Sequence, residues 1–166
     1  KLGAGIDRAT QMGPLANVRR VETTADFVGD AEEKGARVLV RSDARHPEPG
    51  FFHSPVVLAD IPISARIMTE EPFGPIASLN RFDDVDAAIV EANRLPFGLA
   101  AYCFTQNGRR QNRLGDEIEA GMIAINSTSV SAPDSPFGGV KDSGAGSEDG
   151  PEGIMAHLIT KTIHMN

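Results

Sequence analysis

Three things are scarce in this 166-residue sequence, and each scarcity narrows what the chain can be. A single cysteine excludes an internal disulfide. Lysine and arginine number 16 against 23 acidic residues and form no cluster, so the net charge of −7 argues against nucleic acid or an anionic membrane as partner. No apolar run has the length of a membrane span or the form of a signal sequence, which predicts a reducing, cytoplasmic setting.

The rest of the composition is typical of a soluble globular protein. Hydrophobic residues make up 40% and charged residues 23% of a chain that is long enough for one domain with its own core. The four histidines show no metal-ligand spacing, so no metal site is predicted. Residues 1–5 contain no initiator methionine, and we therefore expect the chain to be a piece of a longer one.

Helical and strand patterns alternate along the chain. Asn17 is placed to cap a helix that Gly35 ends, and Asp83 is placed to cap a second helix that Pro96 stops. Further elements are a helix over residues 107–120, a loop over 46–50, and strands over 37–40, 51–58, 76–79, 99–104 and 122–125. The strand over 99–104 is continuously apolar, as a strand covered on both faces should be. The alternation predicts an α/β fold with an open, mostly parallel sheet flanked by helices.

The segment Glu-Glu-Pro-Phe-Gly-Pro at residues 70–75 stands out because it cannot be a regular helix or a central strand. Each proline fixes φ and removes an N–H, so a stiff loop is predicted. Such a loop would hold the carboxylate of Glu71 and the ring of Phe73 ready to hydrogen-bond a hydroxyl and to press on a flat ligand group. The alternative is an ordinary turn with a solvated acidic pair and a core phenylalanine.

A second irregular stretch, residues 126–150, is rich in serine, glycine and proline and long for a structureless loop, which suggests a functional role. It contains another Pro-Phe-Gly at residues 136–138, and Pro151 then opens a short helical turn. A terminal strand is predicted over residues 158–165. Its two faces carry Leu158, Thr160, Thr162 and His164 on one side and Ile159, Lys161, Ile163 and Met165 on the other.

Three motifs in this order resemble the C-terminal, catalytic-domain part of the NAD(P)-dependent aldehyde dehydrogenase family. They are the segment at residues 70–75, Phe-Gly-Leu-Ala-Ala at 97–101, and Pro-Phe-Gly-Gly-Val-Lys-x-Ser-Gly at 136–144. The resemblance covers essentially the whole chain, and residues 126–137 are most similar to the succinate-semialdehyde dehydrogenase branch. It implies oxidation of an aldehyde, with succinate semialdehyde as a candidate, to a carboxylic acid, with NAD or NADP as hydride acceptor.

The resemblance also implies roles for single residues around the cofactor. Glu71 matches the glutamate that hydrogen-bonds the nicotinamide ribose hydroxyls, and Phe73 matches the ring that packs by the nicotinamide. Glu148 matches a glutamate near the catalytic cysteine that is implicated in proton relay. Ser147 stands where the family usually has arginine, which puts the salt bridges around Glu148 in doubt.

On the substrate side, Phe137 matches an aromatic residue lining the substrate tunnel, and Asn126 lies at the strand end that leads into it. Ser131 falls where the succinate-semialdehyde branch has a serine that binds the distal carboxylate, although loop serines also commonly serve only turns. The family's nucleophilic cysteine lies upstream of Lys1. Cys103 is interpreted as a small hydrophobic core residue instead, so the chain alone is expected to be inactive.

By this resemblance, residues 1–157 form a partial catalytic domain without nucleophile segment or cofactor domain, and residues 158–166 form an oligomerisation strand. A homodimer or higher oligomer with residues 158–165 at or near the contact is expected, and a frayed terminus is the alternative. For the function, a non-catalytic binding or assembly module on the same fold is the alternative.

Overall fold

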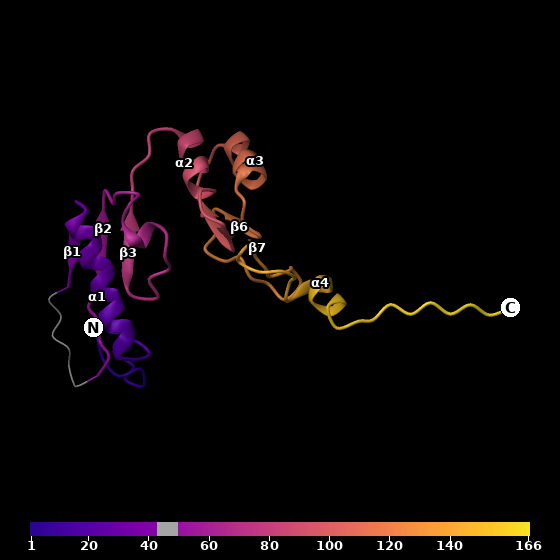
Figure 1. Ribbon diagram of the computed structural model, residues 1–166, viewed down its shortest axis with the longest axis horizontal. Coiled ribbons are helices and arrows are strands. Elements are labelled where there is room, and N and C mark those ends of the chain that lie inside the picture. Colours follow the sequence, from indigo (N-terminus) through magenta and orange to yellow (C-terminus); the bar gives the residue numbers. More distant parts are fainter. Residues whose placement is uncertain (43–49) are drawn as a thin grey trace. The chain divides into compact units, whose positions relative to one another are not determined.

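The computed structural model describes residues 1–42 and 50–166, which form two compact units, Lys1–Arg81 and Phe82–Asn166 (Figure 1). We refer to them as unit 1 and unit 2. The loop predicted over 46–50 falls outside the described residues except for Gly50. Within the described part, no helix combines the length and the apolar character that crossing a membrane requires.

Unit 1 is a helix packed on a three-stranded sheet (Figure 1). Helix α1 (Val18–Glu33) begins where Asn17 Oδ1 accepts from the backbone N–H of Arg20 at 3.1 Å, and Gly35, with φ 104°, follows its end. Strand β1 (Arg37–Arg41) pairs antiparallel with β2 (Val56–Ala59), and β2 pairs parallel with β3 (Ile76–Leu79). The 3-10 helix η1 (Arg66–Met68) lies between β2 and β3 in the sequence.

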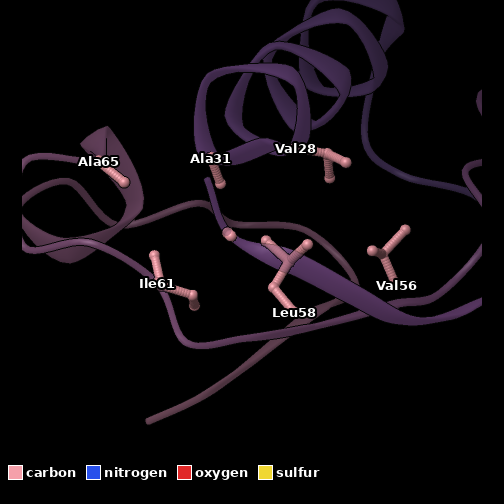
Figure 2. Packing of buried hydrophobic residues seen from close by; sticks show 7 residues of the cluster. Val28, Ala31, Val56, Leu58, Ile61 and Ala65 are labelled. Carbon is pink, nitrogen blue, oxygen red and sulfur yellow. The ribbon is translucent and has the colours of Figure 1, made fainter. Parts of the chain in front are cut away.

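The core of unit 1 lies between α1, β2 and the residues that follow β2 (Figure 2). Ala31 on α1, Leu58 on β2 and Ala65 are each 0% exposed. Burying a leucine side chain contributes roughly 2 kcal/mol. The remaining labelled members of this cluster are Val28, Val56 and Ile61. This core fixes where the chain leaves β2 and therefore supports the segment that leads to residues 70–75.

Unit 2 contains the helices α2, α3 and α4, a parallel strand pair and a second, antiparallel pair (Figure 1). Helix α2 (Val85–Ala92) is followed by β4 (Phe97–Gly98) and β5 (Ala100–Cys103), and α3 (Gly108–Glu117) connects β5 to its parallel partner β6 (Met122–Ile125). Strand β7 (Val140–Lys141) returns to pair antiparallel with β4. The short helix α4 (Gly150–Met155) follows.

The predicted mixture of helices and strands is confirmed, but the described residues form three small sheets rather than one open sheet. Two of their four strand pairs are parallel and two are antiparallel. The described part of the connection between β1 and β2 contains no helix, and these two strands run antiparallel. The connection from β2 to its parallel partner β3 contains only the 3-10 helix η1. The α/β pattern therefore holds only where α3 separates β5 from β6.

Several boundaries differ from prediction for local reasons. Asp84, not Asp83, caps α2, because its carboxylate oxygens accept from the N–H groups of Asp86 and Ala87 at 3.3 and 3.2 Å. Strand β2 begins only after Pro55, which has no N–H to donate to a ladder.

Two predicted strands lack their expected partners. Around β5, Tyr102 is 50% and Phe104 is 64% exposed, so the strand predicted over 99–104 is not covered on both faces in this chain. Residues 158–165 are exposed and form no strand in the described chain (Figure 1). Whether they pair with a second copy stays a prediction.

Candidate functional site

Residues 66–74 lie along one face of α1, held by side chains spaced one helical turn apart. Toward the C-terminal end of α1, the backbone N–H of Arg66 donates to Oδ2 of Asp30 at 2.8 Å, and the guanidinium carbon of Arg66 lies 4.8 Å from the ring centroid of the buried Phe27. The same guanidinium donates to both carboxylate oxygens of Glu70 at 3.0 and 3.1 Å. These hydrogen bonds, together with the positive charge of Arg66, lower the pKa of the Glu70 carboxyl group.

The next contact along α1 fixes the glycine of the segment. A Cβ on Gly74 would lie 2.9 Å from Cγ2 of Thr24 and closer still to its hydroxyl oxygen, so only glycine fits at this distance. Thr24 is 0% exposed, and its hydroxyl donates to the carbonyl oxygen of Arg20 at 2.6 Å. The loop backbone therefore lies directly against α1, which supports the predicted stiffness.

Glu71 and Phe73 are presented outward by this anchored backbone. Glu71 is exposed, and Phe73 is 61% exposed with φ 41°, a backbone angle that a bulky residue adopts only when its surroundings impose it. The guanidinium carbon of Arg20 lies 5.2 Å from the Phe73 ring centroid. Phe73 is therefore not a core phenylalanine in this chain, whereas Glu70 and Glu71 are exposed, as the alternative of an ordinary turn expected. That Glu71 and Phe73 form a ligand site stays a prediction.

The other four candidate residues belong to unit 2, in the loop over 126–150. Asn126 has φ 56°, and its side chain is engaged by the backbone of Thr105. The N–H of Thr105 donates to Oδ1 at 2.8 Å, and Nδ2 donates to the carbonyl oxygen of Thr105 at 2.9 Å. These bonds tie the end of β6 to the residues after β5, so Asn126 fixes where the loop starts.

Phe137 and Glu148 are brought together by their backbones. The N–H of Phe137 donates to the carbonyl oxygen of Glu148 at 2.8 Å, and the N–H of Glu148 donates to the carbonyl oxygen of Phe137 at 2.7 Å. A Cβ on Gly138 would lie 2.6 Å from the carbonyl oxygen of Gly146, so the two arms of the loop approach at glycines. Phe137 is half-buried, whereas Glu148 is exposed and lines a pocket of about 400 Å³.

Ser131 lies in a serine-rich part of the same loop. Its carbonyl oxygen accepts from the hydroxyl of Ser129 at 3.4 Å, and Ser131 itself is exposed. The hydroxyl of Ser127 in turn accepts from the N–H of Ser129 at 3.1 Å. The backbone around Ser131 is thus held by neighbouring serines.

Sequence reasoning missed the basic residues that hold these segments. Lys141 Nζ donates to the carbonyl oxygens of Asn93 and Leu95 at 3.1 and 3.2 Å and pairs with Glu119. It therefore fastens β7, next to the Phe137 arm, to the chain that follows α2. Lys141 lies inside the motif at 136–144, but its partners are 46 and 48 positions away, and no local pattern in the sequence connects them.

Cys103 is confirmed as a core residue. It is 9% exposed, and burial raises the pKa of its thiol above the usual value. A thiol in this state is a poor nucleophile.

Comparison with known proteins agrees with the motifs. The model of the aldehyde dehydrogenase family matches residues 1–163. The 4-(hydroxymethyl)benzenesulfonate dehydrogenase TsaD1 of Comamonas testosteroni is 45% identical over 99% of this chain and 34% of its own length. Succinate-semialdehyde dehydrogenase [NADP(+)] GabD of Escherichia coli is 40% identical over 96% of this chain and 33% of its own.

A solved structure shows the same fold. The betaine aldehyde dehydrogenase of Staphylococcus aureus in complex with NAD+ superposes with a TM-score of 0.89 and 32% identity, covering 97% of this chain and 33% of that one. The chain thus spans about a third of the length of the curated relatives it matches. Because the family match leaves out only the last three residues, 164–166, this chain belongs to the aldehyde dehydrogenase family.

Proposed function

We propose that the chain is the C-terminal part of the catalytic domain of an NAD(P)-dependent aldehyde dehydrogenase, which oxidises an aldehyde to a carboxylic acid. The family match over residues 1–163 carries this proposal. The anchored segment with outward Glu71 and Phe73 supports it, because this geometry suits a ligand that offers hydroxyl groups beside a flat ring. The proposal implies a longer protein, the complete enzyme, of which this chain is one part.

The cofactor side of the proposal rests on the chemistry of two side chains. The carboxylate of Glu71 accepts hydrogen bonds from ribose hydroxyls, and the Phe73 ring offers a flat apolar surface to the nicotinamide. The bound dinucleotide supplies the acceptor for the hydride. Both NAD and NADP stay open, since GabD is named for NADP(+) and the betaine enzyme was solved with NAD+.

For the proton transfers, Glu148 is the candidate acid or base. Its backbone is fixed by the bridge to Phe137, while its carboxylate lines an open pocket and stays accessible to water. A carboxylate held in this way can take a proton from a water molecule. Phe137, on the opposite arm, supplies apolar surface for the substrate, and Asn126 sets the start of the loop that carries both.

The relatives suggest a substrate class. TsaD1 is named for a benzenesulfonate and GabD for succinate semialdehyde, and both compounds carry an anionic group away from the carbon that reacts. We assign to this chain an aldehyde with a remote carboxylate or sulfonate, with succinate semialdehyde as the specific candidate. The exposed hydroxyl of Ser131 donates to that anionic group.

The test is steady-state kinetics of the complete enzyme with succinate semialdehyde and with an uncharged aldehyde of similar length. Ser131→Ala should raise KM for the anionic aldehyde by about 5- to 30-fold, which corresponds to roughly 1–2 kcal/mol for one hydrogen bond to a charged group. The uncharged aldehyde should be nearly unaffected. Ser135→Ala, which removes another exposed serine hydroxyl of the loop, is the matched control.

Two outcomes count against the proposal. If Ser131→Ala changes KM equally for both aldehydes, the proposed anionic substrate class is wrong, and the proposed dehydrogenase activity still stands. Absence of nicotinamide reduction with any aldehyde, under both cofactors, removes the activity itself.

For assembly, residues 158–165 are proposed to pair with another subunit. Ile159 is 95% and Met165 is 90% exposed. Apolar side chains on an extended segment with open edges favour association.

A further inference from the structure

A cation lies beside the ring of Phe73, on a residue of α1 whose backbone takes part in the contacts that hold the loop. The guanidinium carbon of Arg20 is 5.2 Å from the ring centroid. Arg20 is half-buried, whereas its neighbour Arg19 is exposed. The carbonyl oxygen of Arg20 accepts from Thr24, and Thr24 also contacts Gly74, the residue after Phe73.

The ring keeps room for a second flat group. It is 61% exposed although Arg20 lies over it, so a face or edge of the ring is free to stack. A cation over an aromatic ring is attracted by the negative potential of its face. Arg20 therefore does two things at once: it orients the ring, and it places a positive charge behind it.

We infer that Arg20 is a positioning residue for Phe73 whose charge shifts the preference of this site toward the reduced nicotinamide and away from the oxidised one. The inference rests on the proposed function, in which the nicotinamide packs by Phe73. Hydride transfer removes two electrons and one hydrogen nucleus from the substrate carbon and delivers them to the nicotinamide ring. The oxidised ring is a cation and the reduced ring is neutral, so only the oxidised form is repelled by Arg20.

The size of the effect follows from the distance. Stacking on the side away from Arg20 adds at least about 4.5 Å between ring centroids to the observed 5.2 Å, which places the nicotinamide roughly 10 Å from the guanidinium. At roughly 10 Å, Coulomb's law predicts about a 2-fold preference for the neutral form at a dielectric constant of about 80, and about 15-fold at about 20. Because Phe73 is largely exposed, an effect of about 2- to 5-fold is expected.

The experiment measures Kd for NAD+ and NADH, or for the NADP pair, by calorimetry on the complete enzyme. Arg20→Met should shift the ratio of the two dissociation constants by about 2- to 5-fold in favour of the oxidised form. Arg20→Lys keeps the charge and should keep the wild-type ratio. Arg19→Met removes the same charge from an exposed neighbouring position and is the matched control.

Raising the salt concentration provides a test that needs no substitution. Screening of the Arg20 charge by salt should move the wild-type ratio of the two dissociation constants toward the ratio of Arg20→Met. The effect of salt on the cofactor phosphates cancels from this ratio, because both redox forms carry the same phosphates. This readout distinguishes a charge effect from misfolding of a variant, because a purely structural loss weakens both forms together and does not follow salt.

The outcomes separate the role of Arg20 from the proposed activity. A ratio that is unchanged in Arg20→Met and insensitive to salt overturns the role of Arg20, and so does an equal shift in Arg19→Met. Absence of binding of either cofactor form overturns this inference together with the cofactor site. A shifted ratio in a protein that oxidises no aldehyde supports Arg20 and refutes the dehydrogenase proposal alone.

Discussion

Replacing Gly74 by alanine would push a methyl group into the contact between the 70–75 segment and α1. The new Cβ would lie 2.9 Å from Thr24 Cγ2 and 3.2 Å from Thr24 Cβ, with the hydroxyl oxygen closer still. Thr24 cannot move aside easily, since it is 0% exposed and hydrogen-bonded to the carbonyl oxygen of Arg20. Gly74 has no positive φ, so the penalty is steric. Overpacking of this kind costs about 1–3 kcal/mol.

The assay is amide hydrogen exchange of α1 and β2 in the full chain, under increasing urea. Tyrosine fluorescence does not serve here, because the single tyrosine, Tyr102, lies in unit 2. Adding Thr24→Ala to Gly74→Ala removes Oγ1 and Cγ2 and leaves only the 3.2 Å contact with Cβ. The double variant should therefore be more stable than the sum of the single effects predicts, by about 1–2 kcal/mol.

Gly29→Ala is the matched control on α1. A Cβ at Gly29 meets nothing within 4 Å, so alanine should stabilise this helix by about 0.5–1 kcal/mol through its higher helix propensity. The anchoring of the loop on α1 is wrong if Gly74→Ala leaves the hydrogen exchange of α1 unchanged. It is also wrong if the effects of the substitutions at positions 24 and 74 on the free energy of unfolding are simply additive.

Three further predictions concern unit 2. Lys141→Met should lower the free energy of the local opening that exposes the Phe137 and Glu148 amides by roughly 1–3 kcal/mol for the lost hydrogen bonds, so these amides should exchange faster relative to those of β6. Lys161→Met on the exposed tail should leave their exchange unchanged. Arg113, through its hydrogen bond and its charge, lowers the pKa of the Glu117 carboxyl group from near 4.5. This contribution to stability is present above about pH 4.5 and is lost as the pH falls through the lowered pKa, so Arg113→Met should weaken the acid dependence of unfolding followed by Tyr102 fluorescence. Light scattering on a chain ending at His157 tests the tail, since an oligomer that survives the deletion excludes residues 158–165 from the contact.

The elements that were predicted well are those with local signals. Asn17 and Gly35 bracket α1 because a capping side chain and a left-handed glycine act on their own neighbours in sequence. Strands β3 and β6 have the predicted bounds because each apolar run is short and followed by a polar or irregular segment. The motifs also placed Phe137 and Glu148 in one irregular loop, and the structure pairs their backbones.

The contacts that were missed join residues far apart in the chain. Arg20 meets Phe73 across more than fifty positions, and the sequence contains many other arginines that could have done so. The antiparallel pairing of β4 with β7 was also missed, because each strand has only two residues and gives no periodic signal. Local patterns therefore located the candidate residues, but they did not reveal which basic side chains hold them.

The exposed surface around β5 is the clearest point where sequence and structure differ, and the difference has a physical interpretation. The run over 99–104 has the apolar character of a strand buried on both faces, yet Tyr102 and Phe104 are 50% and 64% exposed. They line an apolar pocket of about 320 Å³ with residues of α2 and α3. The curated relatives are about three times as long as the part this chain matches. Under the proposed function, we expect further polypeptide of the complete enzyme to cover this surface, in keeping with a sequence that has the pattern of a buried strand.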